Sequence, residues 1–360
     1  DQDDAGEKCA QFLREKLGKR GIRIQIASKD INDLLKLHGY DKARTILNQA
    51  YEEAKYQDPV QLRSIAEFRD VVGDYFDAES DIRKGSGFGF QKIDEEDIRI
   101  RPNEFWGVTG INGSGKSMFL GQVGWSLMNQ GKKLLIASHE MSPDKTLGRM
   151  MQQGSGLKKP NEEYLDKMFD FLGTKLWLFV DEQGIRPEID ELLTCFEYAY
   201  RRYDVDVFVI DSMTNYLSHD DYKGQQTFIE KIVAFKMAFP VTVFLVTHSR
   251  KLENEARSPE KFDVKGSGAI TDLADAFISV WKNKPKTDHL DECAIMQRLP
   301  DEKIARQWDL YFQCLKNRNG MWEGRVGFDF DPQSCQYLES RGSSPKPFIK
   351  PPPPKDHPIL

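Results

Sequence analysis

The feature that most constrains this chain is a glycine-rich segment between an apolar run and a helical pattern. The segment is a complete GxxxxGKS pattern made of Gly110, Ile111, Asn112, Gly113, Ser114, Gly115, Lys116 and Ser117. A strand before such a loop and a helix after it form the context that predicts phosphate binding. Glycines let backbone N–H groups turn toward phosphate oxygens. We expect Lys116 to reach the β- and γ-phosphates and Ser117 to ligate Mg²⁺; the alternative is a glycine-rich turn without a ligand.

Short apolar runs alternate with helical patterns from residue 105 onward. The predicted strands are 105–109, 134–138, 176–180, 207–210, 241–246, 277–280, 310–315 and 326–330. This alternation predicts an α/β fold in which a mostly parallel sheet carries helices on both faces.

Three of these runs end in side chains suited to phosphate chemistry. Asp211 follows the run 207–210 and is expected to help hold Mg²⁺. Glu140 follows the run 134–138 and is our candidate general base, since a carboxylate there can polarise the attacking water. His248 follows the run 241–246 and could sense the loss of the γ-phosphate. The alternatives are an Asp that caps a turn, a Glu that starts a helix and a His satisfied within its turn.

Composition shifts predict four segments. Residues 1–54 read as a small α/β piece, with a helix over 5–19 and a strand over 22–26. Residues 55–84 read as a linker with an amphipathic helix, and 85–339 as the main domain. Residues 340–360 are rich in proline and hold little that can pack, so we expect them to be disordered or extended.

Charge and cysteine content narrow the function classes. The net charge of −6 means that any nucleic-acid contact must come from a local basic surface. The five cysteines are widely spaced without a CxxC, which argues against a disulfide framework or a zinc site and for a reducing compartment. No apolar run approaches the roughly 20 residues that a membrane span needs.

The order of the motifs resembles the hexameric replicative helicases of the DnaB class. The resemblance is greatest to the bifunctional primase–helicases of bacteriophages and to their mitochondrial relative Twinkle. It rests on the ordered set GINGSGKS, SHEM, VFVID, VTHSRK, DVKGSGAITDLAD and LKNRNGMWEGRVGFDFD. It implies a RecA-like core that uses Mg²⁺ with ATP, or with another NTP or dNTP. It further implies a hexameric ring that moves 5′→3′ on single-stranded DNA and unwinds replication forks, in the bacterial cytoplasm for a phage protein or in the mitochondrial matrix.

The same resemblance assigns roles to single residues. Glu140 is similar to the catalytic glutamate, and His248 to the phosphate-sensing residue. Arg318 resembles an arginine finger inserted into the neighbouring subunit's site, with Lys316 beside it; the alternative is a basic surface turn. The adenine would lie between Lys282 and Phe330, although lysine replaces the more usual arginine. In the family, the stretch 250–268 is a DNA-binding loop, and its candidate contacts here are Arg250, Lys251, Lys261 and Lys265. The alternative for this chain is a solvated loop without DNA contacts.

The start of the chain resembles part of a Toprim primase domain. Asp1 and Asp3 stand in a DxDxAG pattern, and carboxylates two residues apart on a strand end can share Mg²⁺. The chain opens without Met, which indicates a fragment, and it lacks the upstream acidic residue and the zinc module of such primases. We therefore expect no primer synthesis from it. A replicative polymerase is a possible partner, but the basic, proline-rich tail gives no support for one. The stretch 288–306 is longer than the family's turn there.

Two other functions remain open. A recombination ATPase of the RecA or RadA type would share the loop and the fold but form filaments. A primase fragment or a regulatory nucleotide-binding scaffold would not hydrolyse ATP productively. Glu140 beside a complete phosphate loop argues against the scaffold, and the Toprim pattern and the Lys316-Asn317-Arg318 sequence argue against the recombinase.

Overall fold

The computed structural model describes residues 4–17, 24–54, 62–76, 85–96, 98–180, 188–218, 220–249, 257–266 and 268–353. The chain divides into two units, Asp1–Phe76 and Asp77–Leu360. The larger unit contains every strand predicted from residue 105 onward, and it positions the candidate site.

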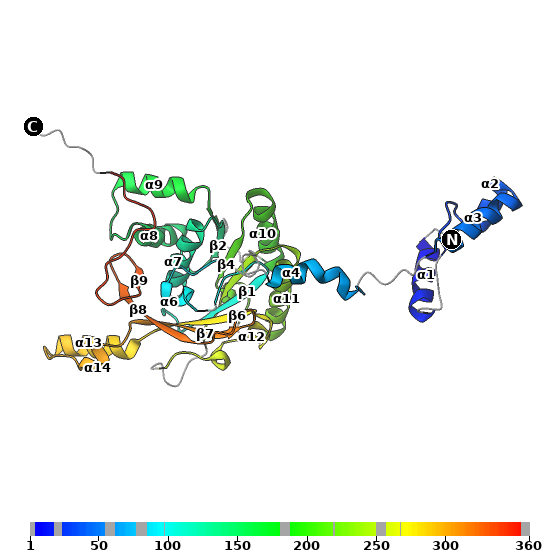
Figure 1. The fold of residues 1–360 in the computed structure, drawn as a ribbon. Helices are drawn as coiled ribbons and strands as arrows, with labels where there is room; N and C mark the ends of the chain where they lie inside the picture. The colour runs from blue at the N-terminus through cyan, green and yellow to red at the C-terminus, as the bar shows by residue number, and fades with distance from the viewer. Residues whose placement is uncertain are drawn as a thin grey trace, which may run out of the picture. The chain divides into compact units, whose positions relative to one another are not determined.

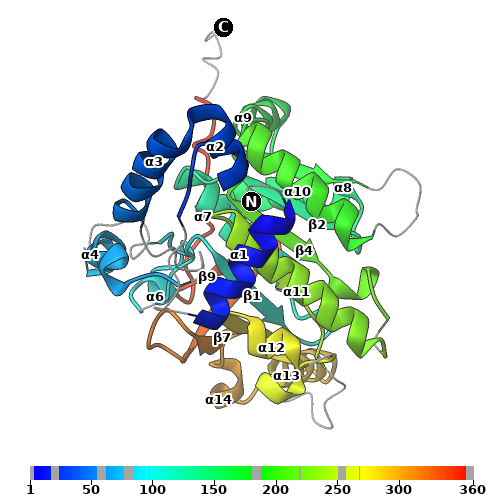
Figure 2. The same cartoon turned by 90° about the vertical axis from the view of Figure 1, so that its right-hand side faces the viewer.

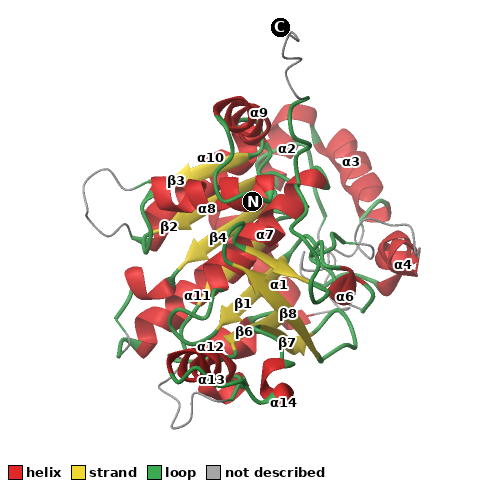
Figure 3. Ribbon diagram, turned by 90° about the vertical axis from the view of Figure 1, so that its left-hand side faces the viewer, coloured by secondary structure: helices red, strands yellow, loops and turns green. Residues whose placement is uncertain are grey.

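One sheet organises the larger unit. In the described part of the chain it has nine strands in the order β3-β2-β4-β5-β1-β6-β7-β8-β9. The strands are β1 (Glu104–Thr109), β2 (Leu134–Ser138), β3 (Leu176–Phe179), β4 (Val207–Asp211), β5 (Thr242–Val246), β6 (Ala276–Lys282), β7 (Leu310–Asn317), β8 (Arg325–Asp331) and β9 (Gln336–Leu338). Pairing is parallel from β3 across to β6 and antiparallel from β6 to β9 (Figure 3). The predicted mostly parallel α/β sheet is confirmed, with β9 as a strand that the sequence pattern missed.

Helices cover both faces of this sheet. One layer contains α6 (Gln91–Asp94), α7 (Lys116–Asn129), α8 (Pro143–Ser155) and α9 (Glu162–Leu172), and the other contains α10 (Ile189–Tyr203), α11 (Tyr222–Ala238) and α12 (Ala269–Leu273). Figure 1 shows the two layers on opposite sides of the strands, and Figure 2 shows the layer with α10, α11 and α12. Short 3₁₀ turns, η3 (Met213–Asn215) and η4 (Lys261–Asp263), follow β4 and β5.

Strand β4 shows why such a sheet forms from continuous apolar runs. Val207 and Val209 join the core shared with α7, α8 and α9, whereas Phe208 and Ile210 join the core shared with α10, α11 and α12. Successive side chains of a strand point to opposite faces. A strand covered on both sides must therefore be apolar at every position, and each buried side chain stabilises the fold by about 1.5–3 kcal/mol.

A helical hairpin connects β6 to β7 and accounts for the long stretch noted in the sequence. It consists of α13 (Lys284–Ile295) and α14 (Glu302–Ala305), which project from the sheet (Figure 1). At its base, Lys286 Nζ lies 2.8 Å from a carboxylate oxygen of Asp309. The apolar residues exposed at its tip are Ile295, Met296 and Leu299.

The tail packs on the larger unit, contrary to the prediction that it holds little that can pack. Its last described part runs along α8 and α9 (Figure 1). Phe348 donates its N–H to the Gly154 carbonyl at 2.8 Å, and its ring stacks on Trp125 with centroids 6.1 Å apart. The Tyr164 hydroxyl donates to the Ile349 carbonyl. Two apolar residues among the prolines and lysines, Phe348 and Ile349, pack against the core that α7, α8 and α9 share with the sheet.

The smaller unit is helical where the structure describes it. It contains α1 (Asp4–Leu17), α2 (Ile31–His38), α3 (Tyr40–Glu52), η2 (Ile65–Phe68) and α4 (Arg69–Phe76). Asp30 caps α2 by accepting a hydrogen bond from the Asp33 N–H at 2.7 Å. The strand predicted over 22–26 is wrong for its described residues 24–26, which have no regular structure. A strand needs a neighbour for its N–H and C=O groups, and the described residues of this unit offer none.

The predicted amphipathic linker helix corresponds to η2 and α4. The apolar face of this helical segment is exposed to solvent in the single chain. The residues on that face are Leu62, Ile65, Phe68, Val71, Val72 and Phe76. Several sequence predictions, namely those for Asp1, Asp3, Arg250, Lys251 and residues 354–360, fall outside the described residues.

Candidate nucleotide-binding site

The glycine-rich segment forms the loop between β1 and α7, as its pattern predicts. Gly115 has a φ of 90°, in the left-handed region that favours glycine. A Cβ atom on Gly115 would lie 2.1 Å from the Tyr337 hydroxyl oxygen, and one on Gly110 would lie 2.3 Å from the Val280 carbonyl oxygen. Neighbouring residues therefore leave no space for a side chain at Gly110 or Gly115. The loop ends at the N-terminus of α7, which is a favourable position for an anion.

Lys116 is the first residue of α7, directly after this loop. It is buried, and its ammonium group donates to the carbonyls of Gly110 at 3.0 Å and Ile111 at 3.2 Å. Burial lowers its pKa, while the nearby carboxylates of Asp211 and Glu140 act in the opposite direction. The cation is thus held over the hollow of the loop, where a phosphate oxygen could replace the carbonyl oxygens as its partner.

Ser117 and Asp211 form the second part of the site. The Ser117 hydroxyl donates to Asp211 Oδ2 at 2.5 Å. Asp211 is 3% exposed, and burial raises the pKa of its carboxyl group. Its other oxygen, Oδ1, is buried and has no hydrogen-bond partner among the described residues. A hydroxyl and a carboxylate with an unsatisfied oxygen are the hard oxygen donors that Mg²⁺ prefers, so these residues fit the predicted metal.

Glu140 and His248 meet at the same edge of the sheet. Glu140 Oε1 lies 3.0 Å from His248 Nε2 and accepts a hydrogen bond from the Ser212 hydroxyl at 2.8 Å. The hydrogen bond from His248 is the main cause that lowers the pKa of Glu140 to about 2. A carboxylate with so low a pKa stays ionised and can orient a water molecule, while it is a weak acceptor of a full proton.

Lys116, Ser117, Glu140 and His248 line one cavity of about 440 Å³, and Asp211 lies behind Ser117. Its lining residues are Asn112, Gly113, Gly115, Lys116, Ser117, Met118, Glu140, Met141, Arg149 and His248. Sequence reasoning missed Arg149, which is exposed on α8 and whose guanidinium donates to the sulfur of Met141 at 2.7 Å. It also missed Ser212. Neither residue belongs to a local motif, and the only signal was their position shortly after Glu140 and Asp211.

The predicted adenine pair is placed as follows. Phe330 on β8 packs its ring 5.3 Å from that of Tyr337, whose hydroxyl lies 3.4 Å from the Gly115 carbonyl oxygen. Lys282 is exposed at the end of β6. Phe330 therefore lies close to the phosphate loop through Tyr337, and the sandwich between Phe330 and Lys282 stays a prediction.

Arg318 and Lys316 lie at the opposite end of the strands from the phosphate loop, where the parallel strands begin. β7 runs antiparallel to β6, so its end pairs Asn317 with Ala276, where β6 begins. The Arg318 N–H donates to the Asp275 carbonyl at 2.8 Å. From Asp275 to Val280, which borders the phosphate loop, the strand rises roughly 17 Å. Arg318 cannot reach the nucleotide site of its own chain.

The described part of the predicted DNA-binding loop touches the site through its backbone. The Lys265 N–H donates to the His248 carbonyl at 2.9 Å. Lys261 lies in η4. Arg257 is paired with Asp263, with N–O distances of 2.6 and 2.9 Å, so it is less available to a phosphate than the two lysines.

Comparisons with known proteins agree with this arrangement. Residues 85–339 match the family described as DnaB-like helicase C terminal domain. The chain is 26% identical over 307 residues to a DNA helicase/primase of Enterobacteria phage T3, covering 79% of this chain and 53% of that protein. The chain thus spans about half the length of this curated relative.

Two solved structures share the fold. One, described as an ATPase domain, superposes with a TM-score of 0.63 at 14% identity, over 79% of this chain and all of that one. A DnaB-like replicative helicase studied for its interactions with primase superposes with a TM-score of 0.59 at 12% identity, over 92% of this chain and 78% of that one. In the described part of the chain, no helix is both long and apolar enough for a membrane span. The family match covers most of the chain and contains the whole cavity, and the chain therefore belongs to the DnaB-like helicase C-terminal domain family.

Proposed function

We propose that this chain is the ATP-hydrolysing motor of a ring-shaped replicative DNA helicase, in which two copies of the chain enclose each nucleotide. The observation that carries this proposal is the separation between the cavity and Arg318. The cavity is lined by the phosphate loop and the carboxylate of Glu140 and is open to solvent on one side, while the candidate finger lies at the opposite end of the strands. A second copy is needed to bring the two together.

The phosphate loop would bind the nucleotide. Backbone N–H groups of residues 110–117 and the ammonium of Lys116 would hold the phosphates of ATP, or of another NTP or dNTP. Ser117 and Asp211 would hold Mg²⁺, which when bound neutralises charge on the phosphates. Phe330, with Lys282 opposite, is the proposed contact for the adenine ring.

Residues from both copies of the chain would take part in hydrolysis. Glu140 would orient the attacking water, since its ionised oxygen is already held toward the cavity by Ser212 and His248. His248 bonds both Glu140 and, through its carbonyl, the loop that carries Lys265, which suits a residue that reports loss of the γ-phosphate. Arg318 of the neighbouring copy, with Lys316 beside it, would stabilise the transition-state charge.

The DNA partner would be single-stranded and contacted through its phosphates. Lys261 and Lys265 are the proposed contacts in the described part of the loop, and Arg250 and Lys251 are proposed from the sequence; these four cations would supply the local positive charge that a chain of net charge −6 needs. Such contacts do not depend on sequence, as a translocating motor requires. We propose 5′→3′ movement on the basis of the family resemblance.

Further proposals follow from the relative named a helicase/primase. Residues 1–54, with Asp1 and Asp3, would be the end of a Toprim domain, and this chain would make no primers. Similarity to a phage protein favours a viral protein acting in the bacterial cytoplasm over one of the mitochondrial matrix. A replicative polymerase is the partner for which the tail offers least support, since the tail is rich in proline and lysine.

Mixing of two inactive variants tests the shared site. Glu140→Gln subunits keep the finger but lack the catalytic carboxylate, and Arg318→Ala subunits keep the carboxylate but lack the finger. Each alone should be nearly inactive, and an equimolar mixture should regain ATPase activity at junctions where an intact finger faces an intact site. Absence of any gain, with assembly unchanged, would refute a finger acting between copies.

Electron microscopy with an ATP analogue and an oligonucleotide separates the helicase from the recombinase. Closed rings, of six subunits in our proposal, support the helicase. Helical filaments would instead support the recombination ATPase.

A further inference from the structure

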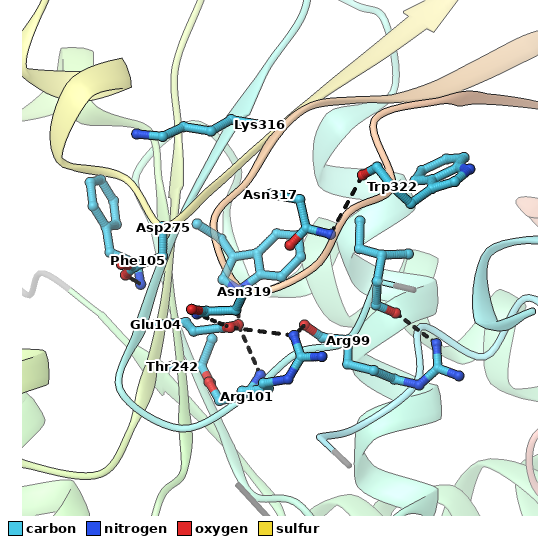
Figure 4. A network of polar contacts seen from close by, with 12 residues as sticks. Arg99, Arg101, Glu104, Phe105, Thr242, Asp275, Lys316, Asn317, Asn319 and Trp322 are labelled. Carbon is cyan, nitrogen blue, oxygen red and sulfur yellow. Dashed lines mark hydrogen bonds and ion pairs between the residues drawn. The ribbon is translucent and has the colours of Figure 1, made fainter. Parts of the chain in front are cut away.

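Two buried carboxylates flank the turn that carries Arg318. Asp275 lies just before β6, and Glu104 begins β1, so both stand at the edge of the sheet where the turn after β7 lies. They are 8% and 2% exposed. A buried carboxylate is costly unless it is paired, and each of these has a buried cation beside it. Figure 4 shows both carboxylates around the residues of the turn.

Asp275 is joined to Arg318 twice. Its carbonyl accepts the Arg318 N–H at 2.8 Å, and its Oδ1 lies 3.6 Å from the Arg318 guanidinium. The Asp275 carboxylate is itself fixed, because Oδ2 accepts from Lys236 at 2.6 Å and from the Phe105 N–H at 2.8 Å. The Arg318 side chain is held at its backbone and at its guanidinium, yet it remains 51% exposed and so can be reached from outside the chain.

Glu104 holds the next residue of the turn. Its Oε1 accepts from the Asn319 amide at 2.8 Å, and its Oε2 accepts from the Arg101 N–H at 2.9 Å and from the Trp106 indole at 2.8 Å. Figure 4 shows Asn319 and Arg101 meeting Glu104 from opposite sides. The carboxylate is saturated by these partners and has little freedom to move.

The end of α12 completes the support. Lys316 donates to the carbonyls of Thr271 at 2.8 Å and Asp272 at 2.9 Å. Arg318 donates to the Asp272 carbonyl at 2.7 Å. Both candidate trans-acting cations are therefore tied to one short helix that follows directly on Lys265 and Gly266. Backbone, side-chain and helix-end contacts all converge on the same turn.

We propose that Asp275 and Glu104 are positioning residues that hold the Lys316–Asn319 turn so that Arg318 enters the neighbouring copy's nucleotide site in a fixed orientation. This inference rests on the proposed function. Its physical reason is that a cation placed about 1 Å from its working position can lose roughly 100-fold in rate, and a guanidinium on an unsupported turn would have to be ordered in each catalytic cycle. The charge of Asp275 is needed in the subunit that donates the finger and has no part in the site that receives it.

The mixed ring tests this asymmetry. Donor subunits carry Glu140→Gln, and acceptor subunits carry Arg318→Ala, so hydrolysis occurs only where a donor finger faces an acceptor site. Asp275→Asn is then added either to the donor or to the acceptor. We expect the regained ATPase activity to fall about 10-fold or more with the change in the donor and to stay within about twofold with the change in the acceptor.

The outcomes separate the positioning role of Asp275 from the proposed function. An equal fall in both arrangements would show that Asp275 only supports the fold, and no fall, or a rise, would show that it does not position the finger; any of these overturns the inference. Absence of regained activity in the parent mixture refutes the proposed function itself, and the inference with it.

A second variant covers the case in which Asp275→Asn does not fold. Asn319 is exposed, so Asn319→Ala removes the tie to the turn while Glu104 keeps its hydrogen bonds from Arg101 and Trp106. It should lower the regained activity by about 2–5-fold in the donor only, because the turn loses one of the hydrogen bonds that fix it. The control is Glu323→Gln in the donor. Glu323 is exposed in the connection between β7 and β8, and this change should leave the regained activity unchanged. Equal activity of the Asn319→Ala and control donors would count against the proposal.

Discussion

The contact between the tail and α7 can be tested by removing one ring. Phe348 is half-buried and stacks on Trp125, with centroids 6.1 Å apart and planes inclined by 21°. Trp125 is fully buried, and on it Phe171 forms a second stacked contact at 5.9 Å. Phe348→Ala therefore uncovers a core tryptophan while the backbone bond of residue 348 to Gly154 can remain.

The expected loss follows from these contacts. Burial of a half-covered phenylalanine ring contributes roughly 1–2 kcal/mol, and the aromatic pair adds about 0.5–1.5 kcal/mol. We expect the free energy of unfolding of the larger unit to fall by about 2–3 kcal/mol. At roughly 2 °C per kcal/mol for a unit of this size, the melting temperature should fall by about 4–6 °C.

Thermal unfolding followed by circular dichroism and tryptophan fluorescence measures this shift. The matched control is Phe262→Ala, since Phe262 is 88% exposed and its loss should change stability by no more than about 0.5 kcal/mol. Identical melting temperatures for the two variants would refute the reasoning and show that the tail does not pack on Trp125 in solution.

Three further changes probe the site. Glu140→Gln keeps an amide oxygen that can accept from Ser212 and His248, so nucleotide binding measured by fluorescence titration should persist while ATP turnover falls about 10²–10⁴-fold; hydrolysis at the original rate would remove Glu140 from its role. His248→Ala removes the main hydrogen bond that holds the Glu140 pKa near 2, so that pKa should rise toward its ordinary value in ¹³C NMR titrations. A lowered carboxyl pKa stabilises the fold above the unfolded value of 4.5 and loses this effect as the pH falls toward 2, so the stability advantage over the variant should shrink across that range, and a constant difference would contradict the assignment. Lys265→Ala should reduce the stimulation of ATPase by single-stranded DNA and lower the salt dependence of binding by about one phosphate contact, whereas Lys158→Ala, an exposed lysine between α8 and α9, should not.

Much of the site could be predicted because its parts lie at the ends of parallel strands. Asp211, Glu140 and His248 each follow an apolar run, and carboxyl ends of parallel strands meet at one edge. The side chains that complete the arrangement could not be predicted. Ser212 has no local signal, and Tyr337 comes from β9, which is too short to be distinguished from a turn.

The sequence by itself determined the phosphate loop, since that loop works through backbone groups of eight consecutive residues and the strand and helix beside them. It also indicated eight of the strands, most directly β1, β4 and β5, which are buried along their whole length and lie in apolar runs. The place of Arg318 was decided only by the tertiary structure. A connection as long as the one between β6 and β7 usually serves a parallel crossover, yet here it folds into the α13–α14 hairpin and β7 returns antiparallel. The direction of a strand depends on hydrogen bonds with its neighbour, which no local pattern contains, and that direction places the arginine at the edge facing away from its own phosphate loop.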